Sequence, residues 1–184
     1  MLGNTTLSPM VVTAQYIKQN QPKDKVVFIG PCMAKKSEML SDSAVEYVDY
    51  VLTFEEMMAL LDAKSIEFDT EEGERQSSIY GLGFAQSGGV SNAVLQIVNE
   101  NEWENRIIPK SCNGAVECKK ALTIANAGRL TENLLEGMVC EGGCIGGPAT
   151  ITQVNNARRN LNRKLKDNDI SSISDNLKKL DLLS

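Results

Sequence analysis

The chain has 184 residues, enough for one domain or slightly more with a real hydrophobic core. Its net charge of −5 argues against nucleic acid as a general partner, and the absence of histidine excludes imidazole catalysis and histidine ligation of zinc. No apolar run has the length of a membrane span and no signal-peptide pattern opens the chain, so we expect a cytoplasmic protein without a membrane partner.

The first predicted element is a helix that begins after Ser8. The Ser8 side chain suits a helix N-cap, Pro9 suits the first helical position, and the apolar spacing continues to about Asn20. The apolar run 26–29 then predicts a short, buried strand of a parallel sheet. Cys32 follows at the carboxyl end of this strand, which is where open α/β sheets build their sites.

The middle of the chain continues the alternation of strands and helices. A second strand is expected over 48–52, and the capping-box pattern of residues 53–56 predicts that a helix follows. Residues 65–78 are polar and acidic and predict a surface excursion. The pair Gly88-Gly89 precedes a helical pattern, where it could bind an anion or let two backbones approach, although it matches no phosphate-loop motif.

Two further strands complete the predicted sheet. We expect a third strand over 106–110, a helix over 115–127, and a fourth strand over 134–139 that leads into Cys140. Strands that alternate with helices indicate a parallel sheet. The sequence therefore predicts an α/β fold with a mostly parallel sheet of about four strands flanked by helices.

The cysteines favour metal ligation. An odd number of cysteines without a secretion signal indicates a reducing compartment, and soft thiolates suit iron–sulfur clusters or zinc. Cys140 and Cys144 are separated by Glu141 and two glycines, and glycine lets the backbone wrap closely around a bulky cluster. A glycine-rich turn with two incidental thiols is the alternative interpretation. The five cysteines are Cys32, Cys112, Cys118, Cys140 and Cys144.

The end of the chain has an apolar spacing close to a heptad. Ile151, Val154, Leu161 and Leu165 follow this spacing, which Arg158 interrupts, and a second short helix is expected over 170–180. We expect residues 1–150 to form the main α/β lobe. Residues 151–184 would form amphipathic helices that either pack on this lobe or link it to a further module.

Two motifs resemble the C-terminal domain of the large subunit of iron-only (FeFe) hydrogenases. The pattern Pro-Cys-x-x-Lys-x-x-Glu occupies residues 31–38, and the pattern Glu-x-Met-x-Cys-x-Gly-Gly-Cys-x-x-Gly occupies residues 136–147. Between them, residues 87–90 are similar to the Thr-Gly-Gly-Val segment of the family. The resemblance covers about residues 5–150 and implies one lobe of the hydrogenase active-site domain.

The resemblance implies a cofactor and a role for each matching residue. The family binds the H-cluster, in which a 4Fe-4S cluster held by four cysteines is bridged to a two-iron centre with CO and cyanide ligands. Cys32, Cys140 and Cys144 match three of these ligands, with Cys144 as the bridge. Lys35 matches a lysine that donates to cyanide, Met138 a methionine near the two-iron centre, and Glu38 a structural glutamate, while Gly142 and Gly143 would offer N–H groups to cluster sulfurs.

The chain also departs from the family pattern. The first family motif, Thr-Ser-Cys-Cys-Pro, is absent and with it the fourth ligand, so we expect the sequence to be a piece of a hydrogenase. Its partners would then be the N-terminal lobe and iron–sulfur modules of the same chain, and these 184 residues alone would bind no cluster and have no activity. Cys112 and Cys118 match no ligand position and are interpreted as ordinary, partly buried thiols.

Several functions stay open. The complete protein could oxidise H2 or reduce protons with an electron-transfer partner, or it could sense H2 and pass the signal to a C-terminal sensor module. Gly30 in place of a methionine of the catalytic members, and Pro148-Ala149 in place of Gly-Gln-Pro, favour the sensory branch. A non-catalytic iron–sulfur scaffold is a third hypothesis. A structural zinc domain built on Cys32, Cys140, Cys144 and one more thiol is a fourth.

Overall fold

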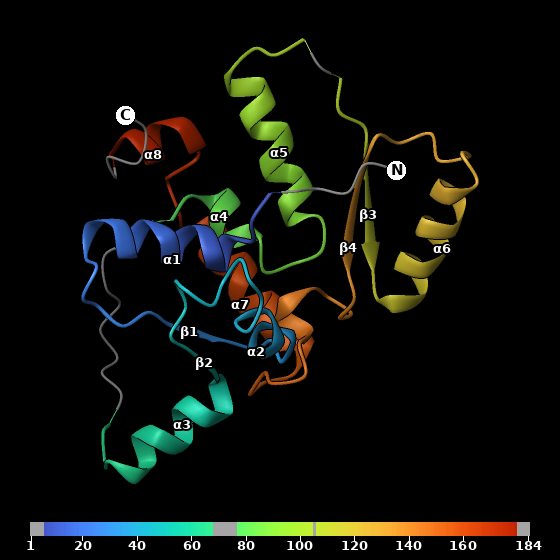
Figure 1. Cartoon of the computed structure of the whole chain (residues 1–184). Helices are drawn as coiled ribbons and strands as arrows, with labels where there is room; N and C mark the ends of the chain where they lie inside the picture. The colour runs from blue at the N-terminus through green and yellow to red at the C-terminus, as the bar shows by residue number, and fades with distance from the viewer. Residues whose placement is uncertain (1–5, 68–76, 105, 180–184) are drawn as a thin grey trace. The chain divides into compact units, whose positions relative to one another are not determined.

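The computed structural model describes residues 6–67, 77–104 and 106–179 (Figure 1). The chain divides into two compact units. Unit 1 comprises Met1–Asp69 with Gly147–Ile151, and unit 2 comprises Thr70–Gly146 with Thr152–Ser184. The boundary between the units falls directly after the cysteine-containing loop that follows the last strand.

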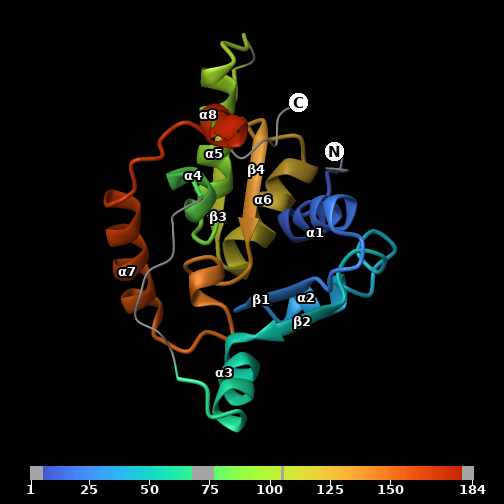
Figure 2. The same cartoon turned by 90° about the vertical axis from the view of Figure 1, so that its left-hand side faces the viewer.

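Unit 1 is built on one parallel strand pair, β1 with β2, which run side by side in Figure 2. The register pairs Val27 with Tyr50 and Gly30 with Thr53. Helix α1 begins as the sequence predicts, because Ser8 Oγ accepts a hydrogen bond from Val11 N–H and proline occupies the first turn. The elements of unit 1 are α1 (Pro9–Asn20), β1 (Val27–Gly30), α2 (Ala34–Glu38), β2 (Tyr50–Thr53) and α3 (Phe54–Ala63).

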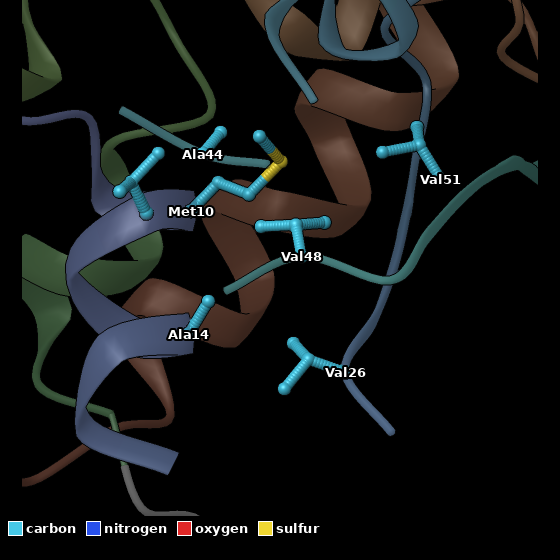
Figure 3. Close-up of a cluster of buried hydrophobic side chains, with 7 residues drawn as sticks. Met10, Ala14, Val26, Ala44, Val48 and Val51 are labelled. Carbon is cyan, nitrogen blue, oxygen red and sulfur yellow. The ribbon is translucent and has the colours of Figure 1, made fainter. Parts of the chain in front are cut away.

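The core of unit 1 forms where α1 meets the segments that lead into the strands. Met10 and Ala14 of α1 point toward Val26, Val48 and Val51 (Figure 3). All of these side chains are buried, so the apolar face of α1 is accounted for by this contact. The helix thereby packs on the segments that precede the two strands and on Val51 of β2.

Asp49, directly before β2, binds three groups at the start of this strand pair. Its carboxylate accepts hydrogen bonds from Lys18 Nζ at 2.7 Å, from Lys25 Nζ at 2.8 Å and from Val26 N–H at 2.8 Å. The hydrogen bonds from the two lysines, with the one from Val26, hold the pKa of Asp49 well below its usual range. The residue therefore ties α1, β1 and β2 together at one point.

Unit 2 is built on a second parallel pair, β3 with β4, in which Pro109 faces Leu134 and Asn113 faces Met138. Helix α6 connects the two strands and packs against both, and α5 also contacts both (Figure 1). The elements are α4 (Ile79–Gly83), α5 (Gly89–Glu100), β3 (Pro109–Asn113), α6 (Ala115–Asn126), β4 (Leu134–Met138), the 3-10 turn η1 (Cys144–Gly146), α7 (Val154–Lys166) and α8 (Ile173–Lys179).

The C-terminal helices pack within unit 2. Helix α7 contacts α4 and η1, and α8 contacts α5. Glu100 of α5 joins this helix to the start of α8: its carboxylate accepts hydrogen bonds from the N–H groups of Ile173 at 2.8 Å and Ser174 at 2.7 Å. Burial alone would raise the pKa of Glu100, but hydrogen bonds from Ser174, Gln96 and the Ile173 backbone lower it to about 2. The division into a lobe over residues 1–150 and a separate C-terminal part over residues 151–184 stays a prediction.

The predicted α/β class with parallel strands is confirmed, and its arrangement differs in one respect. In the described residues the four strands form two separate pairs, whereas one sheet of about four strands was expected. Strand β3 also begins at Pro109 and not at Arg106. The reason is Asn133, whose side chain accepts from Ile108 N–H at 2.7 Å and donates to Arg106 O at 2.8 Å, so that this N–H and this carbonyl bond to a side chain and not to β4.

Other local differences are small. Strand β2 begins at Tyr50, two residues later than expected, because Val48 is part of the core-facing turn before it. The short helices α2 and α4 were not predicted, since neither has an apolar period. Most of the predicted 65–78 excursion and Leu180 lie outside the described residues. None of the helices in the described part of the chain has the length and apolar character needed to span a bilayer.

Candidate metal centre

The loop that follows β4 has a defined shape with a cysteine at each end. Gly143 N–H donates to Cys140 O at 3.0 Å, and Gly142 N–H donates to Asn113 Oδ1 at 2.6 Å. Cys140 and Cys144 are both partly exposed. The turn therefore presents two sulfurs on one short segment that is fastened to the end of β3.

The glycines of this loop are required by its geometry. Gly142 and Gly143 have φ values of +88° and +84°, in the left-handed region that side chains rarely adopt. A Cβ on Gly143 would lie 2.7 Å from Ser87 N and 2.8 Å from Ala85 O, so no side chain fits there. Ile145 N–H donates to Ala85 O at 3.1 Å, which fixes the loop against the segment before α5.

A buried carboxylate holds the segment on which this loop rests. Glu136 of β4 is only 8% exposed and accepts hydrogen bonds from Gly88 N–H at 3.0 Å and Ser91 N–H at 2.9 Å. Ser111 Oγ lies 3.5 Å from the same carboxylate. The anion site suggested by Gly88-Gly89 is thus filled by a side chain of the protein itself, at the N-terminus of α5.

Cys32 has a separate setting in unit 1. It lies directly after β1, as predicted, and is a partly exposed free thiol. The neighbouring Pro31 carbonyl accepts the N–H of Ala149 at 3.4 Å. This bond joins the segment after β1 to the chain that returns to unit 1 after the Cys140–Cys144 loop.

Lys35 lies on α2, three residues beyond Cys32. Its Nζ donates to Glu38 Oε2 at 2.5 Å, and Glu38 also accepts from Ser8 Oγ. Burial raises the pKa of Glu38, but the hydrogen bonds from Lys35 and Ser8 outweigh it and the net pKa is lowered. The ion pair leaves further donor positions on the Lys35 ammonium, which carries three N–H groups. The neighbouring Lys36 forms a different ion pair, in which its Nζ lies 2.8 Å from Glu56 Oε2.

The predicted site residues divide between the two units. Cys32 and Lys35 belong to unit 1, whereas Met138, Cys140 and Cys144 belong to unit 2 with both loop glycines. Within either unit alone, no group of three or more Cys, Asp or Glu side chains among the described residues is arranged to hold a metal ion. The three-cysteine ligand set therefore stays a prediction that involves both units.

The remaining two cysteines have the setting of ordinary thiols. Cys112 is 1% exposed at the end of β3, and burial, with the nearby Cys118 in second place, raises the pKa of its thiol. Cys118 is partly buried, with its Sγ 4.0 Å from Cys112 O. A raised pKa disfavours the thiolate that metal binding requires, which fits the sequence interpretation.

The sequence interpretation missed three residues that shape the loop. Glu136 was noted only as part of a motif, and Asn113 and Ala85 were not singled out. Asn113 lies at the end of β3 just before Gly114, whose N–H donates to Met138 O at 2.8 Å. Polar residues at strand ends beside glycine were a usable signal for Asn113, whereas Ala85 contributes only its backbone carbonyl.

The structure places a Cys-x-Gly-Gly-Cys loop directly after strand β4 of a parallel α/β fold. The profile of the family described as "iron only hydrogenase large subunit, C-terminal domain" matches residues 4–148. The chain therefore belongs to the iron-only hydrogenase large-subunit family.

Solved structures share the fold. An FeFe-hydrogenase structure on oxygen inactivation through modification and degradation of the H-cluster 2Fe subcluster has a TM-score of 0.63 at 19% identity, covering 94% of this chain and 62% of that chain. A structure on stepwise H-cluster assembly, HydA(deltaEFG), has a TM-score of 0.64 at 20% identity, covering 93% and 63%. A variant of HydA1 from Chlamydomonas reinhardtii has a TM-score of 0.62 at 20% identity, covering 93% and 62%.

These matches also set the extent of the likeness. The chain spans less than two thirds of the length of the hydrogenase chains that it resembles, at 62% and 63% of the first two. At this identity the likeness is one of fold.

Proposed function

We propose that this chain supplies three cysteine ligands, Cys32, Cys140 and Cys144, to an H-cluster in an FeFe-hydrogenase-type protein. The observation that carries the proposal is the loop after β4, in which two partly exposed thiols flank two glycines with positive φ, and Gly143 has no room for a Cβ beside the backbone of Ala85 and Ser87. Family membership supports it independently. When bound, the H-cluster would supply the chemistry that interconverts H2 with protons and electrons.

The donor set fits an iron–sulfur group. Thiolates are its usual ligands, and the chain has no histidine that would compete for zinc or another borderline metal. The fourth thiolate would come from sequence outside these 184 residues.

The other matched residues would serve the site without ligating metal. The ammonium of Lys35, fixed by Glu38, would donate to an anionic ligand of the two-iron centre. Met138 would exclude water from it, and the N–H groups around Gly142 and Gly143 would bond to cluster sulfurs. The partners would be the remainder of the hydrogenase chain, H2 and protons, with a C-terminal sensor module as a further partner.

The test uses the complete protein that contains this chain, prepared anaerobically and loaded with a synthetic two-iron complex. We expect infrared bands of bound CO and cyanide together with stoichiometric iron and sulfide. Serine replacement of Cys32, Cys140 or Cys144 should remove the bands, while Cys118→Ser, on α6, should keep them. Stoichiometric zinc without iron would support a structural zinc domain, and an ordinary four-iron cluster without infrared bands would support a scaffold role.

Gly30 favours a sensory role as a second candidate. A Cβ at Gly30 would lie 2.8 Å from the ring of Phe28, so the position that is methionine in catalytic members has no room for a side chain unless Phe28 moves. The site would then lack one side chain that shields the two-iron centre in the catalytic enzymes. Hydrogen uptake by the loaded complete protein tests this: a rate within about tenfold of a catalytic homologue, or about 1.4 kcal/mol in barrier, would count against sensing.

A further inference from the structure

The residue that interrupts the apolar spacing of α7 lies against the cysteine loop. A Cβ placed on Gly142 would meet Val154 Cγ2 at 2.7 Å and Arg158 Nη2 at 3.3 Å. Val154 and Arg158 are four residues apart and so share one face of α7. The guanidinium of Arg158 therefore lies beside the backbone between Cys140 and Cys144.

The sequence position of Arg158 makes this contact unusual. Val154, Leu161 and Leu165 of the same helix are partly buried, as an apolar seam requires, whereas Arg158 stands among them and is exposed. Exposed arginines on a helix are mostly solvated, and Arg159 and Arg163 on α7 fit that description. Arg158 differs because its side chain is directed at the loop of unit 2 that carries Cys140 and Cys144.

The charge on α7 is all of one sign. The helix has no acidic residue over Val154–Lys166, although the whole chain has a net charge of −5. Arginine stays protonated at any pH at which the protein is folded, so its charge at the loop is permanent. A positive charge beside an anionic thiolate cluster stabilises the reduced, more negative state over the oxidised state.

We propose that Arg158 holds a fixed positive charge beside the Cys140–Cys144 loop. This charge raises the reduction potential of the cluster bound there. The inference rests on the proposed function, because it concerns the group that these cysteines would hold. It adds a residue of α7, beyond the region matched by the family, to the site. Solvent exposure of the guanidinium screens its effect and limits the size of the shift.

The experiment compares four forms of the complete, cluster-loaded protein: wild type, Arg158→Gln, Arg158→Lys and Arg163→Gln. The glutamine variant keeps much of the side-chain length and removes the charge, the lysine variant keeps the charge, and Arg163 provides a matched charge removal elsewhere on α7. Spectroelectrochemistry of the four-iron cluster gives the midpoint potential of each form. We expect Arg158→Gln to shift the potential to more negative values, Arg158→Lys to restore most of it, and Arg163→Gln to shift it less.

Three results would count against the charge role of Arg158. Equal shifts for Arg158→Gln and Arg163→Gln, or the same shift for the glutamine and lysine variants, would refute it. Iron content is measured first: loss of iron from Arg158→Gln that Arg158→Lys restores supports the charge, and loss from both refutes it. Failure of the proposed function is distinguishable, because the wild-type protein would then lack the infrared bands of bound CO and cyanide, whether or not it contains an ordinary iron–sulfur cluster.

Discussion

Replacing Glu136 with glutamine should loosen the support of the cysteine loop more than any exposed charge change. The two carboxylate oxygens accept the N–H groups of Gly88 and Ser91, in a position that is only 8% exposed. Glutamine offers one oxygen and one NH2 group, so one backbone N–H would face another donor. Loss of a hydrogen bond to a charged acceptor costs about 1.5–3 kcal/mol, and the buried donor left unpaired costs about 1–3 kcal/mol more.

The expected cost is therefore about 2.5–6 kcal/mol, against a total stability of about 5–15 kcal/mol for a typical domain. Native-state hydrogen exchange of the Gly88 and Ser91 amides in the metal-free chain measures it locally, and urea unfolding measures it globally. Glu46→Gln, on an exposed residue of unit 1, is the matched charge control and should change stability by less than about 0.5 kcal/mol. A loss below about 1 kcal/mol for Glu136→Gln would refute the role given to this carboxylate.

Three further predictions concern other contacts. Gly143→Ala should destabilise unit 2 by clearly more than Gly128→Ala in a urea unfolding comparison, because both positions have positive φ but only Gly143 meets backbone atoms at 2.7 Å; equal losses would contradict the close approach. Protonation of Glu100 should release α8: its pKa of about 2 lies below the unfolded value of about 4.3, so its stabilisation is complete above pH ~4.3 and is lost as pH falls toward 2. The Ser174 amide resonance should report this loss, and Glu100→Gln should remove its pH dependence. Thr53→Ala should lower the free energy of unfolding by about 1 kcal/mol, because it breaks the capping box of α3. Urea unfolding measures this loss, and Thr131→Ala, at a threonine that caps no helix, is the control.

Elements that depend on neighbours in sequence could be predicted from the sequence. Helix α1 follows from Ser8-Pro9, and α3 follows from the capping box, in which Thr53 Oγ1 accepts from Glu56 N–H at 3.2 Å. Strand β4 was predicted within one residue of its end. In each case the signal is a cap or an apolar run of a few residues.

Features that depend on distant partners could not be predicted. The pairing of four strands into two separate pairs is decided by packing, because an apolar run such as Val27–Gly30 fits any parallel neighbour. The start of β3 was wrong by three residues because Asn133, far along the chain, binds the backbone of residues 106 and 108. Short helices such as α2 lack periodicity and are formed by the turn after β1.

The candidate site combines both kinds of information. The glycines between Cys140 and Cys144 are legible in the sequence because their φ values are a local requirement of the turn. The atoms that these glycines approach could not be predicted, because the contacts at Ala85 and Ser87 are made by backbone and depend on no particular side chain. Glu136 also binds this segment, through Gly88 N–H. The segment before α5 is thus held between a buried carboxylate and the cysteine loop. We therefore expect that a change in either contact would shift the loop that carries the two sulfurs.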